Sequence, residues 1–259
     1  MTSRILDTEK CIGCGKCVND CINQYLVLTE DANGRKKISF KERGRCLECG
    51  HCNAICPQRA ISGGKGEFGC DEKDSLLSLM AGKRTIRHYV KDSHIDQDIL
   101  EKIVTAGQSA PTDRNRKSAR VLLIKDNLPK VYNLALDYLV AEVQKTGTIN
   151  PLFVPTMNLD SKREEVLWNA EYLVAFVGLP TSIIDASISA ERMQLEAASL
   201  GIGTAYRGDM KTAINNAGEL RELLGIRNNE EVLITFSMGI TNLKYLSPAI
   251  KINRKVEYL

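Results

Sequence analysis

The chain has 259 residues, more than one average domain needs, and 43% of them are hydrophobic, enough to build one or two cores. Its formal net charge is only +3, with basic and acidic residues interspersed. Nothing in that balance requires a nucleic acid or an anionic membrane as a partner.

No apolar run approaches the roughly 20 residues that a membrane-spanning helix needs. The start of the chain, "MTSRILDTEKC", also lacks the apolar centre of a signal peptide. We therefore expect a cytoplasmic protein whose thiols stay reduced. In that setting, closely spaced cysteines indicate metal or redox chemistry rather than disulfides.

Eight of the nine cysteines lie between Cys11 and Cys56, in two copies of the spacing C-x2-C-x2-C-x3-C. A structural zinc site normally takes two ligands from each of two separated knuckles, whereas here three thiols crowd together in each copy. The spacing favours cubane iron–sulfur clusters, each held at three corners by one copy and at the fourth by the other copy's last cysteine. Zinc, or a single degraded cluster, is the alternative.

Residues 1–62 resemble the bacterial-type ferredoxins with two [4Fe–4S] clusters. By that resemblance one cluster is bound by Cys11, Cys14, Cys17 and Cys56, and the other by Cys46, Cys49, Cys52 and Cys21. The first copy departs from the pattern, since Ile22 stands where proline is usual. That departure weakens the turn after Cys21 and removes no ligand. Asn33–Gly34 predicts a β-hairpin over residues 25–40, as the small α+β ferredoxin fold requires.

A glycine-rich stretch over residues 63–73 is predicted to be a flexible linker between two domains. Cys70, within it, is predicted to be a free thiol. His51, which lies between two predicted ligands, is predicted to be a partly exposed loop residue.

Residues 74–259 alternate helical and strand patterns, which predicts an α+β domain with a sheet flanked by helices. Helices are predicted over 74–82, 95–111, 128–145 and 182–206, and strands over 119–126, 171–180 and 230–240. No G-x-G-x-x-G opens a helix after a strand and no G-x4-G-K-[ST] occurs, so a Rossmann-type dinucleotide site is unsupported.

Three basic or polar segments of this region could bind a phosphate: "GKRTIRHYV", "SAPTDRNRKSARV" and "SPAIKINRK". Taken singly, each is typical of solvated surface. Together with "AASLGIGTAYRG", their order resembles the nitroreductase family of FMN enzymes over residues 74–259. The resemblance implies a homodimer with two FMN sites at the subunit interface.

The resemblance also assigns residues to the FMN site. By the resemblance, the phosphate and ribityl chain are bound by Arg84, Thr85, Arg87 and Arg254. The pyrimidine side of the ring falls to Asn115, and the flavin's other end to the backbone at Tyr206, Arg207 and Gly208. One departure alters the pocket edge, because "KSA" at residues 117–119 replaces the family's Q-P-W. Phe153, Met157 and Trp168 could line the substrate pocket, although Trp168 lies in a helical pattern typical of core.

A flavin can take two electrons as hydride and release them singly, whereas each cluster carries one. We therefore expect an FMN oxidoreductase coupled to its own ferredoxin domain. An external donor such as a ferredoxin or reductase would feed the clusters, and a small nitro, quinone or other electrophilic substrate would be reduced. Two alternatives stay open: an NAD(P)H-fed flavin passing electrons out through the clusters, and a non-catalytic electron carrier or redox sensor. No side chain is predicted to be catalytic.

Overall fold

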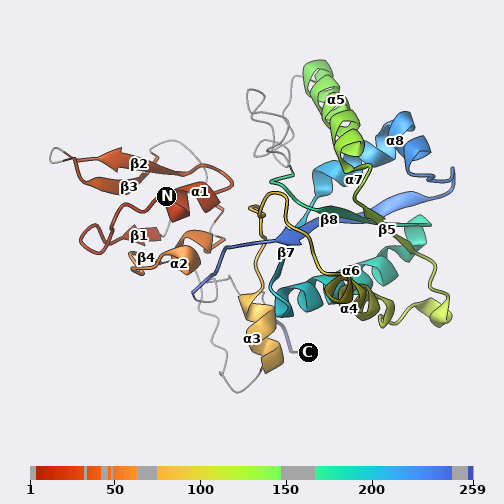
Figure 1. The fold of residues 1–259 in the computed structure, drawn as a ribbon, viewed down its shortest axis with the longest axis horizontal. Coiled ribbons are helices and arrows are strands. Elements are labelled where there is room, and N and C mark those ends of the chain that lie inside the picture. The colour runs from red at the N-terminus through yellow and green to blue at the C-terminus, as the bar shows by residue number, and fades with distance from the viewer. Residues whose placement is uncertain are drawn as a thin grey trace. The chain divides into compact units, whose positions relative to one another are not determined.

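The computed structural model describes residues 4–31, 34–41, 46–47, 49–63, 75–146, 167–246 and 256–258. The chain divides into two compact units (Figure 1). The small unit comprises Met1–Lys83 and Lys244–Leu259, and the large unit comprises Arg84–Leu243. Of the predicted linker, only Gly63 lies within the described residues, and Cys70 lies outside them.

The small unit is built from short elements that follow the two cysteine repeats. Its helices are α1 (Lys16–Asp20), α2 (His51–Ile55) and α3 (Ser75–Gly82), and its strands are β1 (Arg4–Leu6), β2 (Leu26–Glu30), β3 (Lys36–Phe40) and β4 (Ile61–Gly63). Strand β1 pairs antiparallel with β4, and β2 with β3. The β2–β3 pair confirms the predicted hairpin, and Gly34 turns it with a φ of 73°.

Both cysteine repeats fold alike because a glycine precedes each short helix. Gly15 and Gly50 lie before α1 and α2 with φ of 72° and 75°, a conformation that costs a residue without Cβ little. Each helix then ends at the last cysteine of its repeat. The internal sequence repeat is therefore also a structural repeat.

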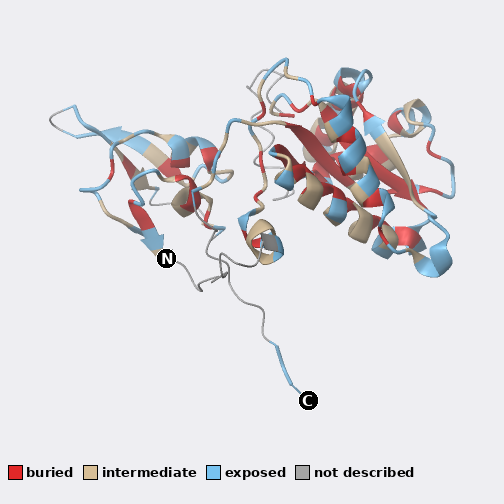
Figure 2. Ribbon diagram, turned by 60° about the horizontal axis from the view of Figure 1, so that its bottom comes forward, coloured by how far each residue is buried: buried red, intermediate tan, exposed pale blue. Residues whose placement is uncertain are grey.

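The large unit is a sheet covered by helices on both faces (Figure 1). In the described part of the chain its strands form one four-stranded sheet in the order β5-β6-β8-β7, and all neighbours are antiparallel. The strands are β5 (Arg120–Ile124), β6 (Tyr172–Gly178), β7 (Ile202–Tyr206) and β8 (Glu231–Ile240). All seven residues of β6 are buried, as its continuous apolar run predicts (Figure 2).

The helices of the large unit are α4 (Gln97–Gln108), α5 (Leu128–Thr146), α6 (Ile183–Ser199), α7 (Gly208–Asn216) and α8 (Gly218–Leu223). On one face, α4 and α6 pack into a core that includes Ile103, Met193 and Phe236. The two helices approach closely at Gly107, where an added Cβ would lie 2.5 Å from the Met193 side chain. Within the described residues, no helix has the length and apolar character needed to cross a membrane.

The α+β class and most predicted elements are confirmed, but the helix predicted over 182–206 is too long. Helix α6 ends at Ser199, and residues 202–206 form strand β7. Gly201 has a φ of 75°, which stops the helix, and the β-branched residues Ile202 and Thr204 then favour an extended chain. Trp168 is likewise in a turn rather than a helix, with a φ of 48°.

Candidate functional site

The last cysteine of each repeat ends its helix in the same way. Cys21 has φ and ψ of −78° and 100°, and Cys56 has −72° and 115°. Each sulfur also accepts a backbone N–H four residues ahead: Tyr25 N to Cys21 Sγ is 3.2 Å, and Ala60 N to Cys56 Sγ is 3.3 Å. Ile22 therefore leaves the turn unchanged, and the two sulfurs share a type of contact that tunes cluster potentials.

One cavity in the small unit is lined by cysteines from both repeats: Cys21, Cys46, Cys49 and Cys52. This is the set that the ferredoxin resemblance assigns to one cluster. Among the described residues, no three His, Cys, Asp or Glu side chains converge on a single ion position. A cubane does not need such convergence, because each thiolate binds a different iron.

Burial changes the chemistry of two of the thiols. It raises the pKa of Cys17 and of Cys52 to about 12, and neighbouring cysteines add to the effect, while the Arg4 guanidinium opposes it at Cys52. A thiol with such a pKa stays protonated at neutral pH unless a metal displaces its proton. Two of the eight cysteines are buried, four are partly buried, and Cys14 and Cys49 are exposed, and a sulfur-rich donor set of this kind fits iron–sulfur clusters.

A polar group that sequence reasoning missed lies between the two cysteine-bearing helices. Asp20, at the end of α1, is buried, and its Oδ2 lies 3.3 Å from Nδ1 of His51. Tyr245 donates its hydroxyl to the same carboxylate at 3.1 Å. His51 was predicted to lie in a loop, but it is the first residue of α2. No local pattern could have found the group, because Tyr245 lies far along the chain.

In the large unit, the segment predicted to bind phosphate runs beside β7. Thr85 forms a parallel bridge with Thr204, and the Ile86 N–H donates to the Thr204 carbonyl at 2.8 Å. Gly203 permits this approach, since a Cβ there would lie 2.7 Å from the Ile86 side chain. Arg84 is buried in this segment. The structure therefore brings the segment with Arg84 and Thr85 close to the end of β7.

The end of β7 is fixed by a buried ion pair. The Arg207 guanidinium donates to both carboxylate oxygens of Asp209, with 2.9 Å between Nε and Oδ1. Burial alone would lower the pKa of Arg207, but the attraction of Asp209 raises it above its ordinary value. The guanidinium also lies 4.9 Å from the centre of the Trp168 ring. The side chain of Arg207 thus lies in the interior. Its backbone is engaged as well, because its N–H donates to the Thr235 carbonyl at 2.9 Å and its carbonyl accepts the Lys211 N–H at 3.1 Å.

Trp168 joins the turn at Arg207 to the segment predicted to bind phosphate. Its carbonyl accepts the Tyr89 N–H at 3.1 Å, and the Tyr89 hydroxyl lies 3.0 Å from Oγ of Ser237 on β8. Through these contacts one network links the residues after Arg87 with the turn at Arg207. Neither Asp209 nor Tyr89 was predicted to have a role.

The loop with Asn115 lies by α6. Asn115 is exposed at the end of a short 3-10 turn (Asp113–Asn115), and the Asp113 N–H donates to Asp185 of α6 at 3.2 Å. Lys117, one of the departures from Q-P-W, lines a cavity of about 320 Å³ together with Asp185 and residues of α4 and β5. Arg254, Phe153 and Met157 lie outside the described residues.

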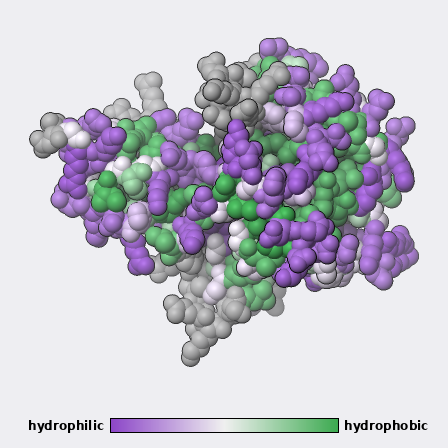
Figure 3. Space-filling view, viewed as in Figure 1, coloured by the Kyte–Doolittle hydropathy of each residue, from purple (hydrophilic) through white to green (hydrophobic). Residues whose placement is uncertain are grey.

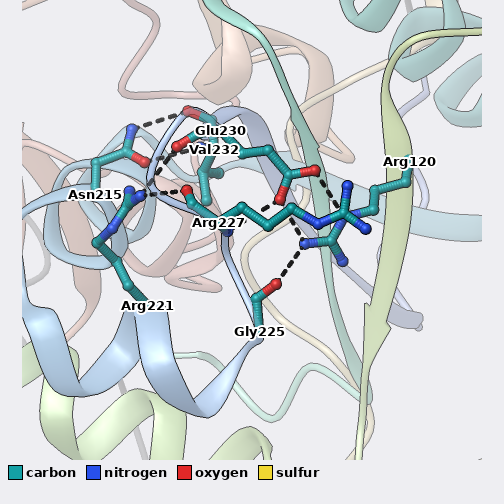
Figure 4. Close-up of polar contacts among 7 residues, drawn as sticks. All are labelled: Arg120, Asn215, Arg221, Gly225, Arg227, Glu230 and Val232. Atoms are coloured by element: carbon teal, nitrogen blue, oxygen red, sulfur yellow. Dashed lines mark hydrogen bonds and ion pairs between the residues drawn. The ribbon is translucent and has the colours of Figure 1, made fainter.

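A second polar cluster of the large unit fastens the loop before β8 (Figure 4). Glu230 accepts from Arg120 of β5 and from the Arg227 N–H, each at 3.0 Å. The hydrogen bond from Arg120, followed by that from Arg227, lowers the pKa of Glu230. Arg221 donates to the Arg227 carbonyl at 2.8 Å, and Asn215 exchanges two hydrogen bonds with the backbone of Val232. These contacts join β5, α7, α8 and the start of β8, and none of the residues belongs to the predicted sites.

Two family profiles match the sequence. Residues 80–240 match the one described as the Nitroreductase family, and residues 10–60 match a 4Fe-4S dicluster domain. An uncharacterized ferredoxin of Methanocaldococcus jannaschii is 42% identical over 57 residues, which are 22% of this chain and 71% of that protein. A ferredoxin of Pyrobaculum islandicum is 38% identical over 58 residues, 22% of this chain and 50% of its own.

Solved structures share the fold of the large unit. An FMN-dependent nitroreductase from Clostridium difficile R20291 has a TM-score of 0.57 at 15% identity, covering 73% of this chain and 100% of that one. A nitroreductase with bound FMN from Bacteroides fragilis NCTC 9343 has a TM-score of 0.54 at 19% identity, covering 71% and 95%. At these identities the likeness concerns the fold alone.

Proposed function

Because the chain belongs to the nitroreductase family and has a 4Fe-4S ferredoxin domain at its amino-terminal end, we propose that it is a flavin oxidoreductase fed by its own clusters. As a family member it is an enzyme. It takes electrons from an external low-potential donor at two [4Fe–4S] clusters, passes them singly to FMN, and delivers them as hydride to a small nitro, quinone or other electrophilic substrate. When bound, FMN supplies the exchange between one-electron and two-electron chemistry.

The observation that supports this proposal best is the cavity lined by Cys21 together with Cys46, Cys49 and Cys52. It gathers ligands from both repeats, as interleaved clusters require. The chain combines a ferredoxin domain with a nitroreductase-family domain, and this combination favours the transfer of single electrons between clusters and flavin. A structural zinc site normally takes two ligands from each of two knuckles, whereas this cavity has three cysteines from the second repeat and one from the first.

In this proposal, the chain's own residues bind and orient the flavin. Arg84, Thr85, Arg87 and Arg254 bind the phosphate and ribityl chain, and Asn115 bonds the pyrimidine side of the ring. The backbone at Tyr206, Arg207 and Gly208 contacts the other end. Gly208 supports that contact, because it begins α7, whose first N–H groups have no partner within the helix, and nothing lies within 4 Å of where its Cβ would be.

We also expect a homodimer with two FMN sites at the subunit interface. Apolar side chains at the start of α6 support this expectation, since Leu179, Ile183 and Ile184 are 44%, 37% and 68% exposed. Figure 3 shows hydrophobic side chains among the hydrophilic ones on the face of the large unit seen there. Exposed apolar groups that lie together are typical of subunit contacts.

The proposal is tested on protein purified without air. Iron, sulfide and FMN are measured first, and about eight irons and one FMN per chain are expected if both clusters and the flavin bind. Reduced ferredoxin or dithionite is then added while the visible spectrum is followed. Bleaching of the clusters and flavin, and its reversal by a nitro or quinone compound, would support the proposal.

Three other outcomes would change the proposal. Clusters without flavin would leave an electron carrier or sensor. Flavin that NAD(P)H reduces before the clusters, with electrons leaving to a protein acceptor, would reverse the direction of flow. Reduced protein that no acceptor reoxidises faster than buffer would refute a reductase.

A further inference from the structure

The chain after β8 contributes to the small unit, to which residues 244–259 belong. There, Tyr245 donates its hydroxyl to both oxygens of Asp20, at 3.1 Å and 3.2 Å. Its ring lies edge-on to His51, with 5.6 Å between ring centres. The Leu246 N–H donates to the carbonyl of Ala54 in α2 at 2.9 Å. One short segment therefore contacts both helices that bear predicted cluster ligands.

Asp20 is the centre of this contact. The carboxylate is almost fully enclosed, since 3% of the side chain is exposed against 12% for His51. It precedes Cys21, while His51 lies between Cys49 and Cys52. All three of these cysteines line the same cavity. Asp20 is thus next in sequence to one predicted ligand of this cluster, and its partner His51 is next to another.

The contact is not a requirement of the repeat itself. In the second copy the position equivalent to Asp20 is occupied by Ile55, and in the first copy the position equivalent to His51 is occupied by Lys16. The two helices nevertheless begin and end alike. The repeat therefore folds with an apolar residue at this position as well as with a carboxylate. Since burying a carboxylate costs free energy unless donors satisfy it, its presence in one copy alone points to a role other than folding.

An oxidised [4Fe–4S] cluster with its four thiolates bears a charge of about −2, and reduction adds one more. A nearby carboxylate opposes that addition, and donors that share its charge reduce the opposition. We propose that Tyr245 is a positioning residue for the cluster bound by Cys21, Cys46, Cys49 and Cys52. Through Asp20 it fixes the α1–α2 pair and keeps the reduction potential of that cluster higher than the bare carboxylate would allow. The inference rests on the proposed cluster assignment.

The experiment uses the full chain with its cofactors, purified without air. Tyr245→Phe removes the hydroxyl and keeps the ring, and Tyr258→Phe is the matched control, because Tyr258 is 95% exposed. Both clusters are titrated with a reductant and followed by electron paramagnetic resonance, and the flavin by its visible absorption. We expect reduction of one cluster to become about threefold to tenfold less favourable in Tyr245→Phe, where tenfold is 59 mV for one electron. The flavin potential and Tyr258→Phe should match the unmodified protein.

A second variant tests the direction in which the Asp20 charge shifts the reduction potential of the cluster. Asp20→Asn removes the negative charge and should make reduction of the same cluster more favourable, whereas a merely structural role would not shift the two variants in opposite directions. Loss of iron in Tyr245→Phe, with full iron content in Tyr258→Phe, would show that Tyr245 has only a structural role and would overturn the inference. Unchanged potentials in both, at full iron content, would overturn it. If the unmodified protein binds no clusters, the proposed function fails, and iron analysis distinguishes that outcome.

Discussion

Removal of the Asp209 carboxylate should destabilise the large unit strongly. Asp209 and Arg207 are 5% and 2% exposed, so Asp209→Asn would leave a buried guanidinium without its counter-charge. Breaking such a pair from one side costs about 3–5 kcal/mol. The Trp168 ring contacts the guanidinium in both proteins and so changes the difference little, but the asparagine oxygen can still accept one hydrogen bond, which retains about 1 kcal/mol. We therefore expect a loss of about 2–4 kcal/mol.

For a domain of this size, that loss corresponds to a decrease in Tm of about 4–16 °C. It can be measured by urea unfolding and by thermal melts, each with and without added FMN, since a bound ligand would shift both. Asp98→Asn is the matched control. Asp98 also lies in the first turn of a helix, but it is exposed and should lose at most about 1 kcal/mol of favourable interaction with the helix dipole.

Equal losses in Asp209→Asn and Asp98→Asn would refute the reasoning, because the pair would then behave as a solvated one. The double variant Arg207→Met/Asp209→Leu gives an independent check. Replacing both charges with apolar groups of similar volume should recover much of the stability lost in the single variant. If the double variant is less stable than Asp209→Asn, the ion pair itself contributes net stability to the fold.

Three further predictions concern the large unit. Glu230→Gln should lower the free energy of unfolding by about 1 kcal/mol at pH 7. Because folding lowers the pKa of Glu230, its carboxylate stabilises the fold above the ordinary pKa of 4.5, and this stability is lost as the pH falls through the pKa of the folded state. The difference from the unmodified protein in urea unfolding should therefore shrink at pH 3.5, and a constant difference would contradict the assignment. Gly203→Ala should weaken FMN binding several-fold by fluorescence titration, since its Cβ would displace Ile86, whereas Gly218→Ala, with open space around it, should not. Arg84→Lys should weaken FMN binding about tenfold through loss of a charged hydrogen bond to phosphate, and an unchanged Kd would remove Arg84 from the proposed site.

Local patterns predicted much of this fold. The apolar run of residues 171–180 predicts a buried strand, and the two cysteine repeats predict two equivalent turns, because each signal needs only neighbouring residues. The helix predicted over 182–206 failed where two local signals met. Its apolar, alanine-rich character continues into β7, and only the positive φ of Gly201 separates the two elements.

The residues that hold the candidate sites in place could not be predicted in the same way. Asp209 lies two residues from Arg207, but nothing in "YRGD" indicates that both side chains are buried and paired, with the guanidinium against the Trp168 ring. The contact of Thr85 with Thr204 joins residues far apart in sequence. The need for glycine at position 203 follows only from the packing of Ile86 against it. Pairings of this kind depend on tertiary packing, which sequence spacing does not encode.

The same distinction applies to the proposed cofactors. Ligands to a cluster follow one another along the chain because three corners of a cubane must be reached from one short loop. The groups that set its potential have no such constraint, since a field acts on the cluster from any direction. Tyr245 and Asp20 are 225 residues apart and meet beside the cysteines. Sequence therefore indicates which cofactor a site could bind, whereas its tuning has to be sought in the folded chain.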